Sequence, residues 1–117
     1  MDYDLEERTA KFGESVIDFI KTLKQNLINS PLISQFIRSA TSIGANYCEA
    51  NNASSKSDFK NKIFICKKEA SETKHWLRMI ARANPDKKDD CKTLWKEVNQ
   101  LTMIFSKIIV SINNRSK

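Results

Sequence analysis

Residues 59–80 of this 117-residue chain read FKNKIFICKKEASETKHWLRMI, with small or apolar side chains at every third or fourth position. These positions follow a heptad pattern over three repeats: Phe59, Ile63, Cys66, Ala70, Thr73, Leu77 and Ile80. A period near 3.5 is typical of a helix that packs one face against other helices. We predict a helix that begins near Ser57, or at Ser55 if the cap is one step earlier. It ends at Asn84-Pro85, because the residue before a proline avoids helical geometry.

Three further segments carry the same period, and polar gaps separate them. The first spans residues 4–27, with apolar positions at Leu5, Phe12, Val16, Phe19, Leu23 and Leu27. The second follows Ser30, a favoured N-cap residue, and Pro31, and its apolar face is Ile33, Phe36, Ala40, Ile43, Tyr47 and Ala50. The last begins at Asp86 or Asp89 and contains Cys91, Leu94, Val98, Leu101, Phe105, Ile108 and Ile112. We expect an all-α protein, an antiparallel up-down-up-down four-helix bundle, with residues 1–117 as a single domain.

The composition excludes several classes of protein. Glycine and proline occur twice each, which is too few for a sheet protein or a glycine-rich phosphate loop. The three cysteines are widely spaced and fit a reducing compartment, where each is expected to act as a small packing residue. No apolar stretch approaches the roughly 18 residues that span a membrane, and no apolar signal region precedes the first helix. We therefore expect a soluble, cytoplasmic protein without a membrane partner.

One pair of residues invites a metal-site interpretation. Glu72 and His75 match the Glu-x-x-His spacing of di-iron helical bundles. Such a site needs two of these motifs and two further glutamates, whereas His75 is the only histidine in the chain. A solvated helix face is the preferred interpretation, and no nucleophile elbow, glycine-rich phosphate loop or cysteine–histidine cluster is present. We expect no metal, no cofactor and no enzymatic activity.

The charge distribution points to an anionic partner. The net charge is +6, and the first 18 residues contain six acids and two bases, so −4 there leaves +10 for the rest. At about 100° per residue, six bases of the third helix lie on one flank of its apolar face. They form the basic ridge: Lys56, Lys60, Lys67, Lys74, Arg78 and Arg82. Such a row can follow a phosphate backbone, although a solvated lysine face remains the alternative. Only Phe64 lies near the ridge, so base stacking is not indicated.

Helices 3 and 4 are apolar on more than one side. Nine large apolar residues lie off their heptad positions: Phe64, Ile65, Trp76, Met79, Trp95, Met103, Ile104, Ile109 and Val110. A helix of a monomeric bundle needs only one apolar stripe about 100° wide. The excess favours burial against another subunit, while a wide core with a few exposed apolar side chains remains the alternative.

The second helix carries a polar stripe on the side expected to lie opposite its apolar face. The stripe consists of Arg38, Ser42, Asn46 and Glu49. It is either the solvated side of the helix or an interaction surface. Glu49 could also brace the turn into the third helix.

The sequence around this stripe is similar to that of a known family. Residues 38–51, RSATSIGANYCEAN, followed by Ser57-Asp58-Phe59 and by residues 68–72, KEASE, resemble the bacterial 23S rRNA intervening-sequence proteins. Asn51 stands one residue beyond the family's usual glycine, so the turn differs slightly. The resemblance implies a small helical bundle that assembles as a homopentamer. The family is related to a group of basic pentameric accessory proteins that bind nucleic acid and a reverse transcriptase. The resemblance implies no catalytic residues.

The leading hypothesis is a non-enzymatic nucleic-acid-binding accessory protein that acts as a homo-oligomer, with RNA favoured over DNA through the family resemblance. The basic ridge would contact phosphates. The alternative is a protein–protein interaction scaffold that uses the polar stripe or the apolar flank of the fourth helix and makes no contact with nucleic acid.

Overall fold

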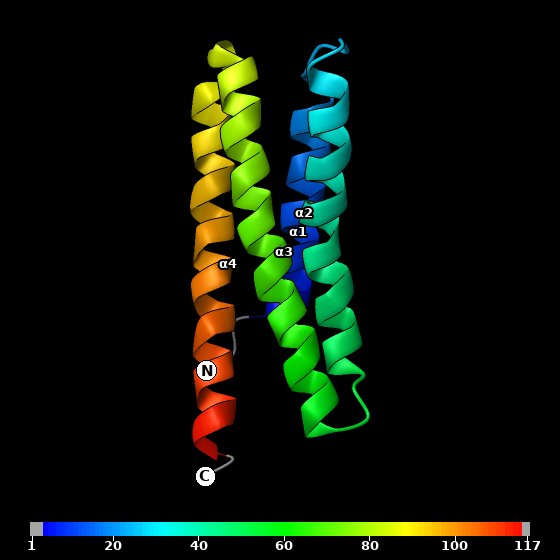
Figure 1. Cartoon of the computed structure of the whole chain (residues 1–117), viewed down its shortest axis with the longest axis vertical. Helices are drawn as coiled ribbons and strands as arrows, with labels where there is room; N and C mark the ends of the chain where they lie inside the picture. The colour runs from blue at the N-terminus through cyan, green and yellow to red at the C-terminus, as the bar shows by residue number, and fades with distance from the viewer. Residues whose placement is uncertain (1–3, 116–117) are drawn as a thin grey trace.

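Four long helices make up the chain in a computed structural model that describes residues 4–115. They are α1 (Leu5–Ile20), α2 (Asn29–Asn51), α3 (Lys56–Ala83) and α4 (Lys88–Arg115), and a 3₁₀ turn at Pro85–Lys87 precedes α4. Successive helices run in opposite directions, which gives a bundle of 50 × 22 × 20 Å (Figure 1). The predicted all-α four-helix fold is confirmed. None of the described helices has a stretch long and apolar enough to cross a bilayer.

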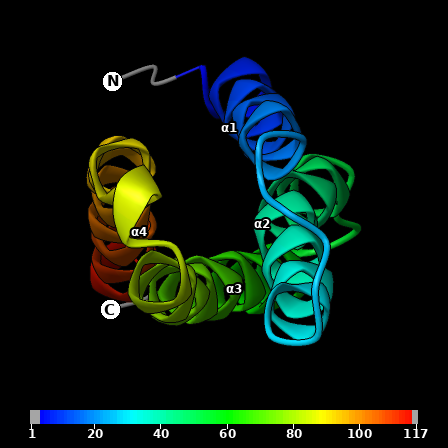
Figure 2. The same ribbon diagram turned by 90° about the horizontal axis from the view of Figure 1, so that it is seen from above.

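The chain passes around the bundle in the order α1, α2, α3, α4 when it is viewed from the end (Figure 2). α3 and α4 have 28 residues each, whereas α1 has 16, so at about 1.5 Å per residue α1 is roughly 18 Å shorter. The most extensive helix contacts join α2 to α3 and α3 to α4, and α1 packs mainly on α2. The pair formed by α3 and α4 therefore extends beyond α1 and offers the longest uninterrupted surface.

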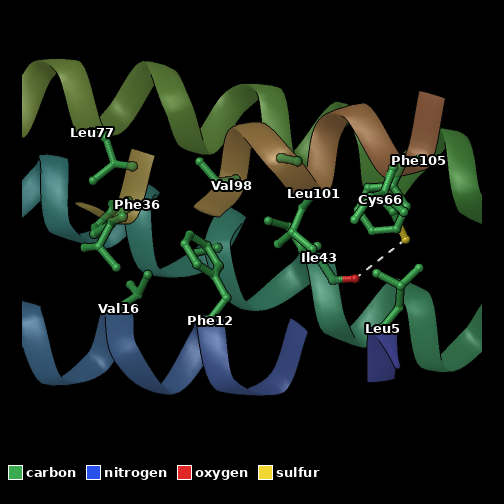
Figure 3. Close-up of a cluster of buried hydrophobic side chains, with 14 of the residues drawn as sticks. Leu5, Phe12, Val16, Phe36, Ile43, Cys66, Leu77, Val98, Leu101 and Phe105 are labelled. Carbon is green, nitrogen blue, oxygen red and sulfur yellow. Dashed lines mark hydrogen bonds between the residues drawn. The ribbon is translucent and has the colours of Figure 1, made fainter. Parts of the chain in front are cut away.

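Side chains from all four helices fill the interior (Figure 3). Phe12, Phe36, Leu77 and Phe105 are each at most 2% exposed and come from α1, α2, α3 and α4 in turn. The heptad positions predicted for α3 are all buried except Phe59, which is half-buried against the core. Inward-facing polar groups find partners: the Thr73 hydroxyl donates to Glu69 O and to Ser39 Oγ. Among the described residues, no buried side-chain nitrogen or oxygen lacks a hydrogen-bond partner.

The end of α1 differs from the prediction. The helix ends at Ile20, and the next two amides make shorter-range bonds, Thr22 N to Phe19 O and Leu23 N to Ile20 O. These i→i+3 bonds tighten the last turn and direct the chain away from the helix axis. Leu23 still reaches the core, but Leu27 is 95% exposed. The assignment of Leu27 to the core was wrong, because the apolar period continues past the point where the helix stops.

The start of α2 also differs. Ser30 is the second residue of the helix rather than its N-cap. The capping acceptor is the side chain of Asn26, whose Oδ1 accepts from the amides of Ile28 and Asn29. The side-chain Nδ2 of Asn29 in turn donates to Lys24 O and to Asn84 Oδ1, which links this loop to the end of α3. Asn26, three residues before the first residue of α2, thus takes the capping role that was expected of Ser30.

Both ends of α3 lie where the sequence predicted them. Ser55 is the N-cap, and its hydroxyl accepts from the amide of Asp58. α3 ends at Ala83, directly before Asn84-Pro85. The 3₁₀ turn contains Asp86, and Asp89 already lies in the first turn of α4.

The nine surplus apolar residues on α3 and α4 divide into three groups by exposure. Ile104 and Ile109 are 7% exposed and belong to the core, because α4 packs against both α3 and α1 and its buried face is wider than one stripe. Trp76 and Met79 are half-buried. Five of the nine are exposed by between 37% and 57%: Phe64, Ile65, Trp95, Met103 and Val110.

Candidate nucleic-acid interface

The basic ridge follows α3 for nearly its full length. Its end residues Lys56 and Arg82 are 26 residues apart, about 39 Å along a helix at ~1.5 Å per residue. Lys56, Arg78 and Arg82 are exposed, and Lys60, Lys67 and Lys74 are half-buried. Within the described part of the chain, none of the six forms an ion pair. Their charges are therefore available to a polyanion.

Lys74 shows that the ridge lies beside α4 rather than on an isolated helix face. Its Nζ donates to Asn99 Oδ1 at 3.1 Å and lies 5.6 Å from the ring centroid of Trp95. The sequence argument found only Phe64 near the ridge and missed Trp95 and Asn99, because it treated each helix separately. An antiparallel pairing of the two helices would have placed Trp95 within reach of Lys74.

Further bases of α4 join the ridge at the α3–α4 turn. Lys88 and Lys92 line the same groove as Arg78, and Lys88 also lies near Arg82 in a neighbouring depression. The ridge is thus widest at this end of the bundle. The sequence signal for this was the lysine-rich stretch from Lys87 to Lys96.

Most acids of α2, α3 and α4 face other sides of the bundle. Glu97 accepts from Arg8 of α1 through both carboxylate oxygens, each at 2.8 Å. Glu49 pairs with Lys62 at 3.3 Å, and Glu69 and Glu72 pair with Arg38. Of the six acids counted near the N-terminus, Asp2 lies outside the described residues, and the others lie at the start of or on α1. Glu49, Glu69, Glu72 and Glu97 therefore do not neutralise the ridge, whereas Asp89 and Asp90 are exposed in the first turn of α4, at the end where the ridge is widest.

The polar stripe does not lie opposite the packing face of α2. Arg38 reaches across to α3, where Nη1 donates to Glu69 Oε2 at 2.8 Å and Nη2 donates to Glu72 Oε1. The side chain of Glu69 is only 8% exposed, whereas that of Arg38 is 47% exposed. The hydrogen bond from Arg38, followed by that from Trp76, lowers the pKa of Glu72. The hydrogen bonds that Arg38 donates to Glu72 and to Glu69 raise its pKa.

The remaining stripe residues are also engaged within the bundle. Ser42 Oγ donates to Arg38 O at 2.6 Å, and Asn46 Nδ2 donates to Ser42 O at 2.8 Å. Glu49 accepts from Lys62 of α3, so it braces α2 against α3 near their connecting turn as one interpretation expected. Arg38 and Glu49 thus join α2 to α3, whereas Ser42 and Asn46 bond within α2.

Glu72 and His75, which were weighed as metal ligands, contact other residues of the bundle. Glu72 is held by Arg38 and Trp76, and His75 is exposed with its ring edge-on to Trp76 at 4.9 Å. No group of three or more His, Cys, Asp and Glu side chains that could hold a metal occurs among the described residues.

The cysteines differ in their surroundings. The Cys66 thiol donates to Ile43 O at 3.6 Å in the core, and burial raises its pKa to about 12 (Figure 3). Burial likewise raises the pKa of Cys91 to about 11. Cys48 was expected to be a packing residue, but it is exposed and contacts Glu6 of α1. High thiol pKa values make Cys66 and Cys91 poor nucleophiles.

Comparisons with known proteins agree on one family. The family model described as 23S rRNA-intervening sequence protein matches residues 1–107. The fold is similar to the crystal structure of a protein of unknown function from the S23 ribosomal protein family of Bacteroides thetaiotaomicron, with a TM-score of 0.77 and 30% sequence identity. That match covers 89% of this chain and 96% of the other. No curated protein matches the sequence.

Proposed function

Because the chain belongs to the 23S rRNA-intervening sequence protein family, we propose that it is a non-enzymatic nucleic-acid-binding accessory protein that favours RNA over DNA. The observation that carries the proposal is the basic ridge, whose six cations lie on one side of α3 and form no ion pair within the described residues. Glu49, Glu69, Glu72 and Glu97 are paired with bases on other sides of the bundle, so these four acids do not compete with an anion for the ridge.

The ridge suits contact with a phosphate backbone. Its bases are spaced at one to two helical turns over about 39 Å, so several can neutralise phosphates together at ~1.5 Å per residue. Lysine and arginine contacts to phosphates release counterions and carry no sequence information directly. The expected binding is strong at low salt, weak at high salt and largely independent of sequence.

We further propose that the single four-helix domain acts as a homo-oligomer, with the pentamer implied by the family resemblance as the first assembly to test. Phe64, Met103 and Val110 support self-association, because they are 44%, 54% and 57% exposed. All three lie toward the end of the bundle away from the α3–α4 turn. Several copies of the ridge in one particle would raise the avidity for a polyanion without any new contact.

A salt series with a structured RNA and a DNA duplex of equal length tests the proposal. We expect log affinity to fall linearly with log salt concentration for both, and the RNA to bind more tightly. A variant with Lys60→Glu, Lys67→Glu and Arg78→Glu should lose binding while its helical circular dichroism is unchanged. The matched control carries Lys24→Glu, Lys68→Glu and Lys107→Glu, which change the net charge equally at exposed positions outside the ridge.

Two results would contradict the proposal. If the ridge and control variants lost nucleic-acid affinity equally, the affinity would depend on the net charge of the protein and not on the position of the ridge. Absence of binding at low salt would reduce the ridge to a solvated face and would favour the protein-scaffold alternative. In that case a pull-down after nuclease treatment should recover one protein partner, which would contact the exposed flank of α4 around Met103 and Val110.

A further inference from the structure

Trp95 is a large aromatic side chain of α4 that the structure places against Lys74 of the basic ridge. It is 42% exposed, and the ammonium of Lys74 lies 5.6 Å from its ring centroid. Within the described part of the chain its indole N–H makes no hydrogen bond, whereas that of Trp76 donates to Glu72. An exposed indole with an uncommitted N–H, held beside a cation, can stack on a second planar ring.

A small cavity lies beside this tryptophan in the groove between α3 and α4. Its volume is about 240 Å³. Trp95 shares the lining with three apolar or small side chains, Leu77, Ala81 and Cys91, and with three bases, Arg78, Lys88 and Lys92. No acid is among these lining residues. The cavity is below the ~300–1,000 Å³ of pockets for drug-sized ligands, so it suits a single ring system better than a larger molecule.

We propose that this cavity binds an unpaired nucleobase, which stacks on Trp95 while its flanking phosphates contact Arg78, Lys88 and Lys92. The proposal rests on the proposed nucleic-acid function and adds to it a preference for single-stranded segments, loops or bulges. Bases in a duplex are already stacked and present only their edges, so only an unpaired base can lie on the indole. Aromatic stacking next to a basic groove is the combination that binds single strands without strong sequence preference.

The charge of the rim argues for this occupant over an apolar side chain of a protein partner. A leucine or phenylalanine would fit the apolar lining but would leave three cations uncompensated around it. A nucleotide supplies the ring and the negative charge together. The sequence argument gave no indication of base stacking because it considered only Phe64, and the proposal differs from it in adding Trp95.

The experiment compares a single-stranded oligoadenylate RNA with a fully paired RNA duplex of the same length. Trp95→Ala should weaken binding of the single strand roughly 5- to 150-fold, since base–aromatic stacking is lost, and should leave duplex binding unchanged. Trp95→Phe should restore most of the affinity. The matched control is Leu27→Ala, which truncates an apolar residue that is 95% exposed and lies outside α3 and α4, and it should affect neither probe. A single-stranded DNA of the same sequence should show the same Trp95 dependence, because the base and not the ribose is stacked.

Three results would overturn this inference while the proposed function stands: equal losses on both probes, no loss on the single strand, or dissociation of the oligomer by Trp95→Ala in sedimentation. The last result would place Trp95 in a subunit contact. Failure of the wild-type protein to bind either probe would overturn both the inference and the proposed function.

Discussion

Replacing Arg38 with methionine tests whether the polar stripe is structural. The change removes the donor to Glu69, whose side chain is 8% exposed, and to Glu72, whose side chain is 30% exposed. A hydrogen bond to a charged group contributes about 1.5–3 kcal/mol when it is buried, and exposed pairs contribute at most about 1 kcal/mol. Glu72 also keeps its bond from Trp76. We expect Arg38→Met to lower the free energy of unfolding by about 2–3 kcal/mol, most of it from Glu69.

Urea unfolding followed by far-ultraviolet circular dichroism measures this loss. At about 4 °C per kcal/mol for a domain of this size, the melting temperature should fall by roughly 10 °C. The control is Arg82→Met, which removes an exposed arginine of α3 that forms no ion pair with any other described residue and should change stability by less than about 0.5 kcal/mol. Adding Glu69→Gln to Arg38→Met should recover part of the loss, because the uncompensated buried charge disappears.

A loss below about 0.5 kcal/mol for Arg38→Met, equal to that of the control, would refute the structural role. The cluster would then make no net contribution to stability. Its exposed guanidinium would become a candidate contact for a protein partner, as the scaffold alternative holds. A changed dependence of the unfolding free energy on urea would instead indicate an altered denatured state.

Three other outcomes follow from the structure. Gly13→Ala should stabilise the protein by about 1 kcal/mol in thermal melts, since its added Cβ makes an ordinary 3.8 Å contact inside a helix, whereas Gly44→Ala should gain less because its Cβ meets Thr9 Oγ1 at 3.3 Å. The pKa of Glu72 is lowered in the folded protein, so ionised Glu72 stabilises the fold fully above its unperturbed pKa of 4.5. This contribution is lost as the pH falls through the pKa of the folded state. The difference in unfolding free energy between wild type and Arg38→Met should therefore shrink in acid. A thiol reagent should label Cys48 rapidly in the native protein and the two buried cysteines only after unfolding.

The fold was predictable because nearly every buried position repeats at helical spacing. Phe36, Ile43, Ile63 and Leu101 are all fully buried, and each belongs to the row assigned to its helix from the sequence. Helix ends were predicted where one local signal dominates, as at Ser55, where a hydroxyl caps the amide three residues later. Such signals depend only on neighbouring residues.

The predictions from the sequence were wrong where contacts between helices determine whether a residue is buried. Leu27 fits the period of α1, but the backbone turns away at Thr22 and leaves it in solvent. Ile104 lies outside the heptad row of α4, but it is buried because that helix packs on two neighbours. Arg38 has the appearance of a solvated residue on α2, and only the position of α3 shows that it holds a nearly buried carboxylate. A single-helix wheel contains none of this information.

Nucleic-acid binding and self-association make different demands on the outer α3–α4 face. Near the α3–α4 turn, Arg78, Lys88 and Lys92 surround the Trp95 cavity. Toward the other end of α4, the exposed side chains of Met103 and Val110 are apolar, and a subunit contact there would leave the α3–α4 turn in solvent. Lys74 lies between these regions, tied to Asn99 and Trp95. An assembly that buries the apolar end would therefore present the Trp95 end of each subunit to one polyanion, and the two proposed functions would reinforce each other.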